Sequence, residues 1–251
     1  MTDHVVIERE DAILNVRLNR PEKKNAMTDA MYSALAAAFR EAEETLGVRV
    51  LVISGEGDSF TAGNDLSSFA SLAGMGENTP VDPPAVELIE RAIRATVPVI
   101  AAVEGWCVGI GATMMLHTDF IYAGEDAKFH MPFTALGAVP EAGASRLLTR
   151  RFGRQRAAQM MIASEPISAE TAHRWGMITD VVENGEAYAA AHACARRIAE
   201  LPPEAVRETK ALMHEHLETL IPHTRHELQR FAERLRSEEM QQVIAARMAK
   251  R

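Results

Sequence analysis

Residues 98–112, P-V-I-A-A-V-E-G-W-C-V-G-I-G-A, decide the fold class of this chain. They begin with an apolar run typical of a strand that is covered on both faces. Glycines then mark a tight turn, and small and apolar residues follow as in a buried helix. A second apolar run at 48–54 leads into a glycine-punctuated loop at 55–66 and then a helix. Such repeated strand, turn and helix units predict an α/β fold.

The flanking sequence extends this pattern. The alternating pattern predicts a β-hairpin at residues 4–8 and 12–19, and short strands at 119–123 and 127–130. Thr28 is predicted to cap a helix. Beyond Gly153 helical patterns dominate. They are expected at 155–163, 168–175, 186–201, 204–217 and 224–251, with one strand at 178–182. The last helix is amphipathic, so we expect it to need a partner surface and the chain to self-associate. It keeps apolar residues at Leu228, Phe231, Leu235 and Met240.

Length and composition exclude several classes of protein. With 251 residues and 47% hydrophobic content, the chain can form one main domain with a full core. A net charge of −8 argues against a nucleic-acid partner. Two cysteines cannot form a disulfide framework and suit a reducing compartment. Because no apolar run is long enough to cross a membrane and the start lacks a signal-peptide pattern, we expect a soluble, cytoplasmic protein without a membrane partner.

One carboxylate stands out in residues 130–146, H-M-P-F-T-A-L-G-A-V-P-E-A-G-A-S-R. Pro140 suits the first position of a helix, which predicts a helix from 141 to about 152, ended by Gly153. Glu141 then lies on the first turn, directly after an apolar stretch. The helix N-terminus favours its anion and desolvation favours its acid, a balance that suits a general base. The alternative is an ordinary first-turn acid that faces water.

The two glycine loops, near 60–65 and 105–112, each follow a buried strand and open a helix. Each can present backbone N–H groups to an anion or a carbonyl oxygen, and two such groups on one oxygen form an oxyanion hole. The alternative for each loop is a tight turn with no other role. A dinucleotide site is not favoured, because Gly109-Ile110-Gly111 lacks the third glycine of that motif.

Four ordered motifs resemble the crotonase, or enoyl-CoA hydratase/isomerase, superfamily over roughly residues 5–215. They are N-R-P-E-K-K-N-A at 19–26, S-F-T-A-G-N-D-L at 59–66, residues 98–112, and D-F-I-Y-A-G-E-D-A-K-F at 119–129. The resemblance implies a spiral of ββα units over 1–195 with an acyl-CoA site. It also implies a helical region at 196–251 that builds trimers or dimers of trimers. The backbone N–H groups of Asn64 and Ile110 would form the oxyanion hole.

The acids depart from the hydratase pattern. Where hydratases of this superfamily carry two glutamates, this chain has Thr113 and Phe133, and neither can replace a carboxylate in adding water to a double bond. Residues 129–141 instead resemble the Δ3,Δ2-enoyl-CoA isomerases of peroxisomal type, whose single catalytic glutamate corresponds to Glu141. Thr113, Phe133 and Leu136 are expected in the acyl pocket, with loop 74–84 at its border. The rivals are a hydratase or other acyl-CoA enzyme of this superfamily that uses another acid, and a non-catalytic acyl-CoA-binding protein.

The CoA moiety is expected along loops 23–26 and 62–66, and no cofactor or metal is expected beyond the CoA of the substrate. Lys23 or Lys24 would lie near phosphate, although a solvated lysine pair is an equal alternative. The residues expected near the adenine are Ala26, Ala62, Asp65 and Leu66. Asp65 is interpreted as a helix cap or loop staple and not as a catalytic acid.

Other polar residues give weaker signals. His117 and His130 are interpreted as structural histidines. Ser145 and Thr113 show no convincing His or Asp partner in the sequence, so a serine hydrolase is not predicted.

Overall fold

The structure is a computed structural model that describes residues 2–65, 83–214 and 217–249. Its main sheet has six strands in the order β1-β2-β3-β4-β6-β9. β1 and β2 form the predicted antiparallel hairpin, and all other neighbours are parallel. The α/β prediction is confirmed. The strands are β1 (Val5–Glu10), β2 (Ile13–Leu18), β3 (Val50–Gly55), β4 (Val99–Val103), β6 (Phe120–Gly124) and β9 (Asp180–Val182).

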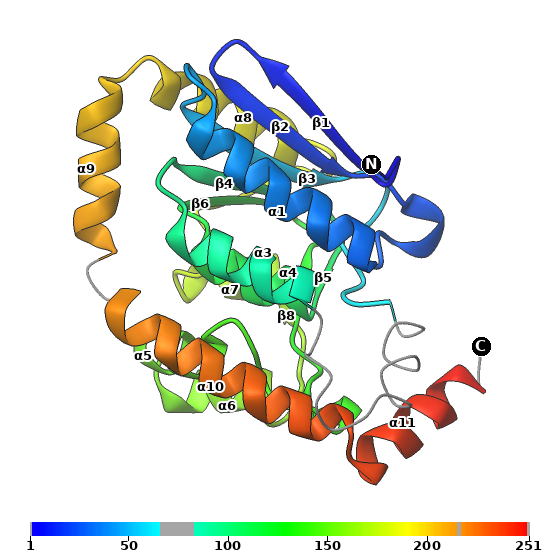
Figure 1. Cartoon of the computed structure of the whole chain (residues 1–251). Helices are drawn as coiled ribbons and strands as arrows, with labels where there is room; N and C mark the ends of the chain where they lie inside the picture. Colours follow the sequence, from blue (N-terminus) through cyan, green and yellow to red (C-terminus); the bar gives the residue numbers. More distant parts are fainter. Residues whose placement is uncertain (1, 66–82, 215–216, 250–251) are drawn as a thin grey trace.

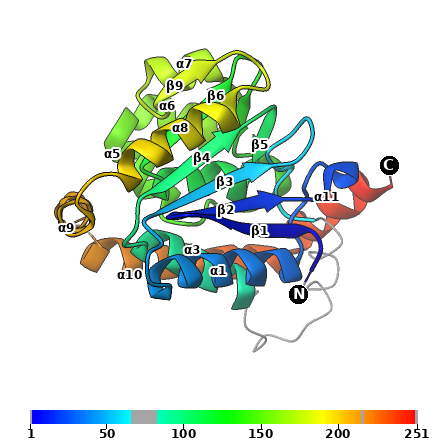
Figure 2. The same ribbon diagram turned by 90° about the horizontal axis from the view of Figure 1, so that it is seen from above.

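The central strands are apolar throughout because both faces of the sheet are covered. In β3, Val50 and Val52 pack with α8 (Ala187–Ala199), while Leu51 and Ile53 belong to the larger core on the opposite face. Figure 2 shows α8 on one side of the sheet and α1 (Asp29–Glu44) on the other. Because successive side chains of a strand point to opposite faces, each strand contributes to two separate hydrophobic cores, one on each face of the sheet.

A second, three-stranded sheet lies beside the first and consists of β5 (Trp106–Val108), β7 (Lys128–His130) and β8 (Ile167–Ser168). The sequence patterns predicted β7 but missed β5 and β8. β5 has three residues between Gly105 and Gly109, and β8 has two residues directly before α7, so a glycine turn and a helix start mask them. Isolated bridges, Thr61 to Cys107 and Ser59 to Gly105, join the first glycine loop to this part of the chain.

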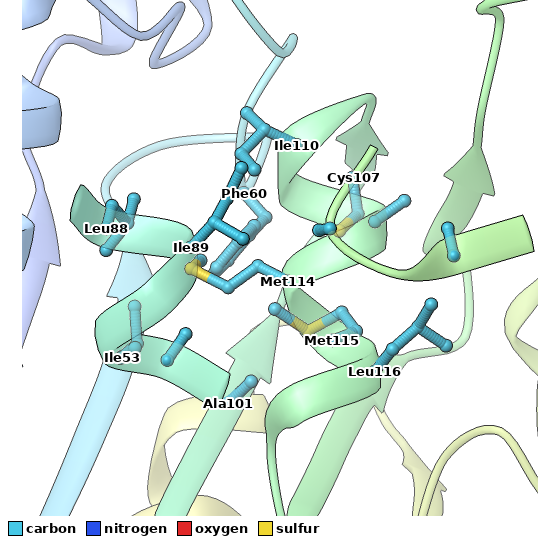
Figure 3. Packing of buried hydrophobic residues seen from close by; sticks show 14 of the residues in the cluster. Ile53, Phe60, Leu88, Ile89, Ala101, Cys107, Ile110, Met114, Met115 and Leu116 are labelled. Carbon is cyan, nitrogen blue, oxygen red and sulfur yellow. The ribbon is translucent and has the colours of Figure 1, made fainter. Parts of the chain in front are cut away.

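The main core lies between the sheet and the helices that follow each strand. Figure 3 shows Met114 directed toward Ile89 and Phe60, while Leu116 points the other way, and all four belong to this one buried cluster. Among the described residues up to 161, the other helices are η1 (Pro21–Lys23), α3 (Pro83–Arg94), α4 (Ile110–Met114), η2 (Met115–His117), η3 (Thr134–Leu136), α5 (Ala144–Phe152) and α6 (Arg154–Met161). Loop 74–84, predicted to border the acyl pocket, lies outside the described residues except for 83 and 84 in α3.

The helix predicted to start at Glu141 starts three residues later, with α5. Ala142 and Gly143 both have left-handed backbones, with φ of 56° and 74°, so the chain between Pro140 and α5 forms a turn. Right-handed helical geometry cannot pass through two such residues. The prediction of Pro140 at the first helical position, and of Glu141 on the first turn, was therefore wrong.

The single helix predicted at 224–251 was also wrong. α10 (Leu217–Leu235) begins before Pro222, and Ser237 caps a separate helix, α11 (Glu238–Met248), by accepting a hydrogen bond from Met240 N. Figure 1 shows α10 and α11 along the lower edge of the same chain. The helices before them are α7 (Ala169–Arg174) and α9 (Pro203–Met213).

The apolar face of this C-terminal part packs within the chain itself. Leu228, Phe231, Leu235 and Met240 all line a cavity described below. These side chains therefore pack against the core of the same chain, and self-association stays a prediction. The proposed division after residue 195 falls inside α8 and stays a prediction. Among the described helices, none has the length and apolar character needed to cross a membrane.

Candidate active site

A cavity of about 520 Å³ lies where the glycine loops, the Glu141 turn and the C-terminal helices meet. Its polar residues cluster at the loops, and most of its apolar residues come from α3, η3, α10 and α11. The lining residues are Arg20, Lys23, Ala26, Tyr32, Ala62, Gly63, Asn64, Asp65, Ala85, Val86, Ile89, Val108, Gly109, Ile110, His130, Pro132, Phe133, Leu136, Ala138, Glu141, Leu228, Phe231, Leu235, Met240 and Arg247.

The two glycine loops form one wall of this cavity and are joined by main-chain hydrogen bonds. Thr61 N donates to Trp106 O at 3.0 Å, and Val108 N donates to Thr61 O at 3.0 Å. Ile110 is the first residue of α4, so its N–H has no partner inside the helix. Among the described residues, no hydrogen bond occupies the N–H of Asn64 or Ile110. Both predicted donors therefore line one cavity with their N–H groups available.

Glycine is needed where the two loops touch. Gly63 has φ of 86°, and a Cβ there would lie 3.0 Å from Val108 O. Gly109 also has a positive φ, 57°, and a Cβ on it would face Gly63 Cα at 3.8 Å. These left-handed backbones turn the chain so that the next residues, Asn64 and Ile110, direct their main chain into the same space.

Residues 19–26 form a loop that is stapled to the first glycine loop. Asn25 is fully buried, and its side-chain Nδ2 donates to Glu56 O at 2.9 Å and Ser59 O at 2.8 Å. Arg20 Nη1 lies 2.7 Å from Asp65 Oδ2 and donates to Ala26 O at 3.0 Å. Asp65 is therefore a loop staple, as predicted. Arg20 was missed, because nothing in the sequence marks its pairing with a residue 45 positions away.

The predicted CoA-site residues are brought together only in part. Ala26, Ala62, Asp65 and Lys23 line the cavity. Lys24 does not; its backbone is left-handed, with φ of 50°, and its carbonyl accepts a hydrogen bond from Ala62 N at 2.8 Å. Leu66 lies outside the described residues. The structure thus favours Lys23 over Lys24, together with Arg20, as the cations at this end of the cavity.

The opposite wall carries Glu141, which is buried with 5% of its surface exposed. Its Oε1 accepts a hydrogen bond of 2.5 Å from the Thr113 hydroxyl, and its Oε2 has no hydrogen-bond partner among the described residues. Burial raises the pKa of Glu141 to about 8, the Thr113 hydrogen bond lowers this pKa, and the charge of Glu227 raises it. The site therefore holds a carboxyl with raised proton affinity and one oxygen free to exchange a proton.

Thr113 and Phe133 occupy different positions around this carboxyl. The Thr113 side chain is fully buried behind Glu141 and does not line the cavity, which corrects its prediction as an acyl-pocket residue. Phe133 and Leu136 do line the cavity, and Phe133 meets Phe231 of α10 edge to face, with ring centroids 6.4 Å apart. An apolar wall therefore stands where a second acid would be needed for hydration.

The turn that carries Glu141 is held by side chains from two other helices. His117 Nε2 lies 2.7 Å from Ala142 O. Because burial lowers the pKa of His117 to about 4, its ring is neutral near pH 7, and Nε2 must carry the proton that the carbonyl accepts. On the other side, Glu227 of α10 accepts hydrogen bonds from Gly143 N and Ser145 N. Sequence reasoning missed Glu227, which lies more than 80 positions from both.

Ser145 has side-chain partners that the sequence did not reveal. His223 Nε2 lies 2.9 Å from Ser145 Oγ, and Glu227 Oε1 accepts a 2.5 Å hydrogen bond from the same hydroxyl. The expectation that Ser145 lacks such partners was wrong. These contacts do not form a nucleophile triad, since Glu227 approaches the same ring nitrogen as the serine does, at 3.2 Å, and Ser145 does not line the cavity.

Residues 8–251 match the family model described as enoyl-CoA hydratase/isomerase. The chain belongs to this family. Across its whole length it is 34% identical to 1,2-epoxyphenylacetyl-CoA isomerase of Escherichia coli, covering 97% of that protein. Over 83% of its length it is 32% identical to enoyl-CoA delta isomerase 2 of Rattus norvegicus, covering 54% of that longer protein.

Solved structures give the same result for the fold. OdaA of Pseudomonas aeruginosa superimposes with a TM-score of 0.92 at 38% identity, over 98% of this chain and 99% of that chain. The crotonase-type fold is therefore confirmed, and the chain is an enoyl-CoA hydratase/isomerase family enzyme. The relatives include both hydratases and isomerases, for example 2,3-dehydroadipyl-CoA hydratase of Escherichia coli at 30% identity over 86% of the chain.

Proposed function

We propose that this family member isomerises 3-enoyl-CoA thioesters to 2-enoyl-CoA thioesters with Glu141 as its single base. One observation carries the proposal. Of the two carboxylates that line the described cavity, Asp65 is bound to Arg20, and Glu141 alone has an oxygen without a partner. Hydration needs groups that activate water as well as groups that protonate carbon, whereas a shift of a double bond needs one group that moves one proton.

The chemistry follows from these groups. Ionised Glu141 removes a proton from C2 of the 3-enoyl thioester, and the electron pair moves through the conjugated system onto the thioester oxygen. The N–H groups of Asn64 and Ile110 stabilise this dienolate. Glu141 then returns the proton at C4, which leaves the double bond between C2 and C3. No cofactor is needed beyond the CoA that the substrate carries.

The raised pKa of Glu141 supports both halves of this transfer. A carboxylate whose acid has a pKa of about 8 is a stronger base toward carbon than an ordinary glutamate. Once protonated, it keeps the proton in a buried site until the proton reaches C4. Phe133, Leu136 and Phe231 surround this region with apolar surface, which limits the access of water to the dienolate.

The test is a paired assay. A 3-enoyl-CoA is followed for the conjugated product and a 2-enoyl-CoA for the 3-hydroxyacyl product, each with the native protein and with Glu141→Gln. We expect isomerisation to fall by about 10³-fold or more in the variant, while product binding measured by calorimetry stays within about twofold. Hydration that survives the substitution would show that another acid acts. Binding without either reaction would indicate a non-catalytic acyl-CoA-binding protein.

A second candidate substrate follows from the relative that aligns with the whole chain, 1,2-epoxyphenylacetyl-CoA isomerase. Tyr32, Phe133 and Phe231 line the cavity, and aromatic side chains suit a phenyl ring. 1,2-Epoxyphenylacetyl-CoA therefore belongs in the same assay as a third substrate. A kcat/KM for it above that for every 3-enoyl-CoA would replace the first proposal.

We also propose that the chain self-associates through the helical region 196–251. In α9 only Lys210 is buried, while Leu212 and Met213 are 66% and 69% exposed. Exposed apolar side chains at the end of one helix favour contact with another copy. The molecular mass in solution, measured by sedimentation equilibrium, tests this, and a monomer at micromolar concentration would exclude it.

A further inference from the structure

A second buried carboxylate, Glu227, contacts the turn that carries the base, and the proposed reaction gives it no role. It is 6% exposed. Its Oε2 accepts a hydrogen bond of 2.6 Å from Gly143 N. Its Oε1 accepts from Ser145 N at 3.0 Å and from Ser145 Oγ at 2.5 Å. Both oxygens are thus occupied by donors, an arrangement that suits a carboxylate anion.

The position of Glu227 explains how a charge can remain there. Gly143 is the N-cap of α5, and Gly143 and Ser145 contribute N–H groups that the first turn of the helix leaves without partners. A carboxylate at a helix N-terminus is stabilised by these groups and by the helix dipole. His223, one turn earlier on α10, adds a further polar contact, with its Nε2 3.2 Å from Glu227 Oε1.

Glu141 has the opposite environment, although only one residue separates it from Gly143. It has one hydrogen-bond donor, the Thr113 hydroxyl, and its second oxygen has no partner among the described residues. The turn therefore carries one carboxyl, Glu141, and is contacted by another, Glu227 from α10. Hydrogen-bond donors surround both oxygens of Glu227 but only one oxygen of Glu141. Such an arrangement pushes the proton affinities of two acids apart.

We propose that Glu227 is a positioning residue for the base: its hydrogen bonds fix the turn that carries Glu141, and its negative charge makes Glu141 hold its proton more tightly. This inference rests on the proposed role of Glu141. In the part of the chain that the structure describes, Thr113 from α4 contacts Glu141 and the charge of Glu227 acts on it. His223 contacts Glu227 and Ser145, and His117 from η2, which is neutral near pH 7, contacts Ala142 O. The pKa of Glu141 responds to the Glu227 charge in the direction that this requires.

The experiment compares pH profiles of kcat/KM for isomerisation. Glu227→Gln keeps the size and one acceptor oxygen of the side chain but removes its charge. We expect the acid limb of the profile to move to lower pH, so that the ratio of rates at pH 6 and pH 9 rises by roughly threefold, or half a pH unit. Thr113→Val removes the only hydrogen bond that Glu141 accepts in the described structure, and the limb should move to higher pH.

A matched control uses the same substitution on the same helix. Glu233 lies six residues beyond Glu227, pairs with Arg230 on the surface and is 47% exposed at its side chain. Glu233→Gln should leave the pH profile unchanged. A merely structural role of Glu227 would lower kcat in Glu227→Gln equally at every pH, without moving the limb, and that result would overturn the inference.

Further variants separate the two parts of the proposal. Glu227→Asp keeps the charge but shortens the side chain, so kcat should fall while the limb stays near its native pH. This variant also serves if Glu227→Gln does not fold.

Failure of the inference differs from failure of the proposed function. If Glu141→Gln still isomerises, Glu141 is not the base; if it is inactive and Glu227→Gln leaves the limb in place, only the role of Glu227 is wrong.

Discussion

On the first wall, main-chain hydrogen bonds join the two loops that present the N–H groups of Asn64 and Ile110, whereas on the second wall side chains hold the turn that carries Glu141. On the first wall, Thr61, Trp106 and Val108 form the link through their backbones. On the second, the Thr113 hydroxyl, the His117 ring and the Glu227 carboxylate each supply a hydrogen bond. The link between the two loops should therefore tolerate changes of the Asn64 and Ile110 side chains, and the turn of Glu141 should be sensitive to single atoms.

The first wall should fail when its backbone is disturbed. In Gly63→Ala, the positive φ of 86° and a Cβ 3.0 Å from Val108 O force the loops apart. Because loss of one oxyanion donor costs roughly 10²- to 10³-fold in kcat, we expect a fall of about 10²-fold. Gly176→Ala is the control, since Gly176 has φ of 77° with open space around it. It should lose stability through strain but keep its kcat. Native kcat in folded Gly63→Ala would contradict the oxyanion role.

Burial of Glu141 on the second wall should lower the free energy of unfolding at high pH. The folded-state pKa of Glu141, about 8, lies above the ordinary value of 4.5. Between these values the folded protein binds a proton that the unfolded chain has released, so the contribution of this group to stability is lost as pH rises. Gln cannot ionise. Glu141→Gln should therefore resemble the native protein near pH 5 and exceed it by a few kcal/mol near pH 9. Urea unfolding at both pH values measures this difference, and a difference independent of pH would refute it.

The smallest effect is expected for a side chain on the first wall. Asn64 is proposed to act through its N–H, and its Oδ1 forms no hydrogen bond with the described residues. Asn64→Ala should change kcat and KM by no more than about twofold, because a backbone donor does not depend on the side chain beyond it. Steady-state kinetics with a 3-enoyl-CoA measures this. A large loss of kcat would mean that the amide side chain itself contacts the substrate.

The sequence predicted the sheet because apolar runs such as 48–54 and 97–103 are long enough to show burial on both faces. It also placed Asn64, Ile110, Phe133 and Glu141, all of which line one cavity. Those placements came from local motifs and a family resemblance, in which every residue stands at a fixed spacing from its neighbours.

What the sequence missed is non-local or breaks a local rule. Pro140 is a good helix start, yet Ala142 adopts a left-handed backbone that alanine rarely takes, and only the tertiary contacts of this turn can hold it there. Glu227 and Arg20 act through partners that are distant in sequence. The break of the last helix did have a local signal, Ser237 before two glutamates, but the amphipathic pattern runs on across it.

α10 serves two purposes at once. Leu228, Phe231 and Leu235 face the cavity expected to take the acyl chain, and Glu227, on the same helix, holds the turn of the base. Leu228 is the neighbour of Glu227 and Phe231 lies one turn beyond it, so a substitution there that shifts α10 also shifts the carboxylate that holds the turn of the proposed base. Engineering this enzyme for longer or bulkier acyl chains through Leu228 or Phe231 would therefore retune its acid-base chemistry together with its substrate range.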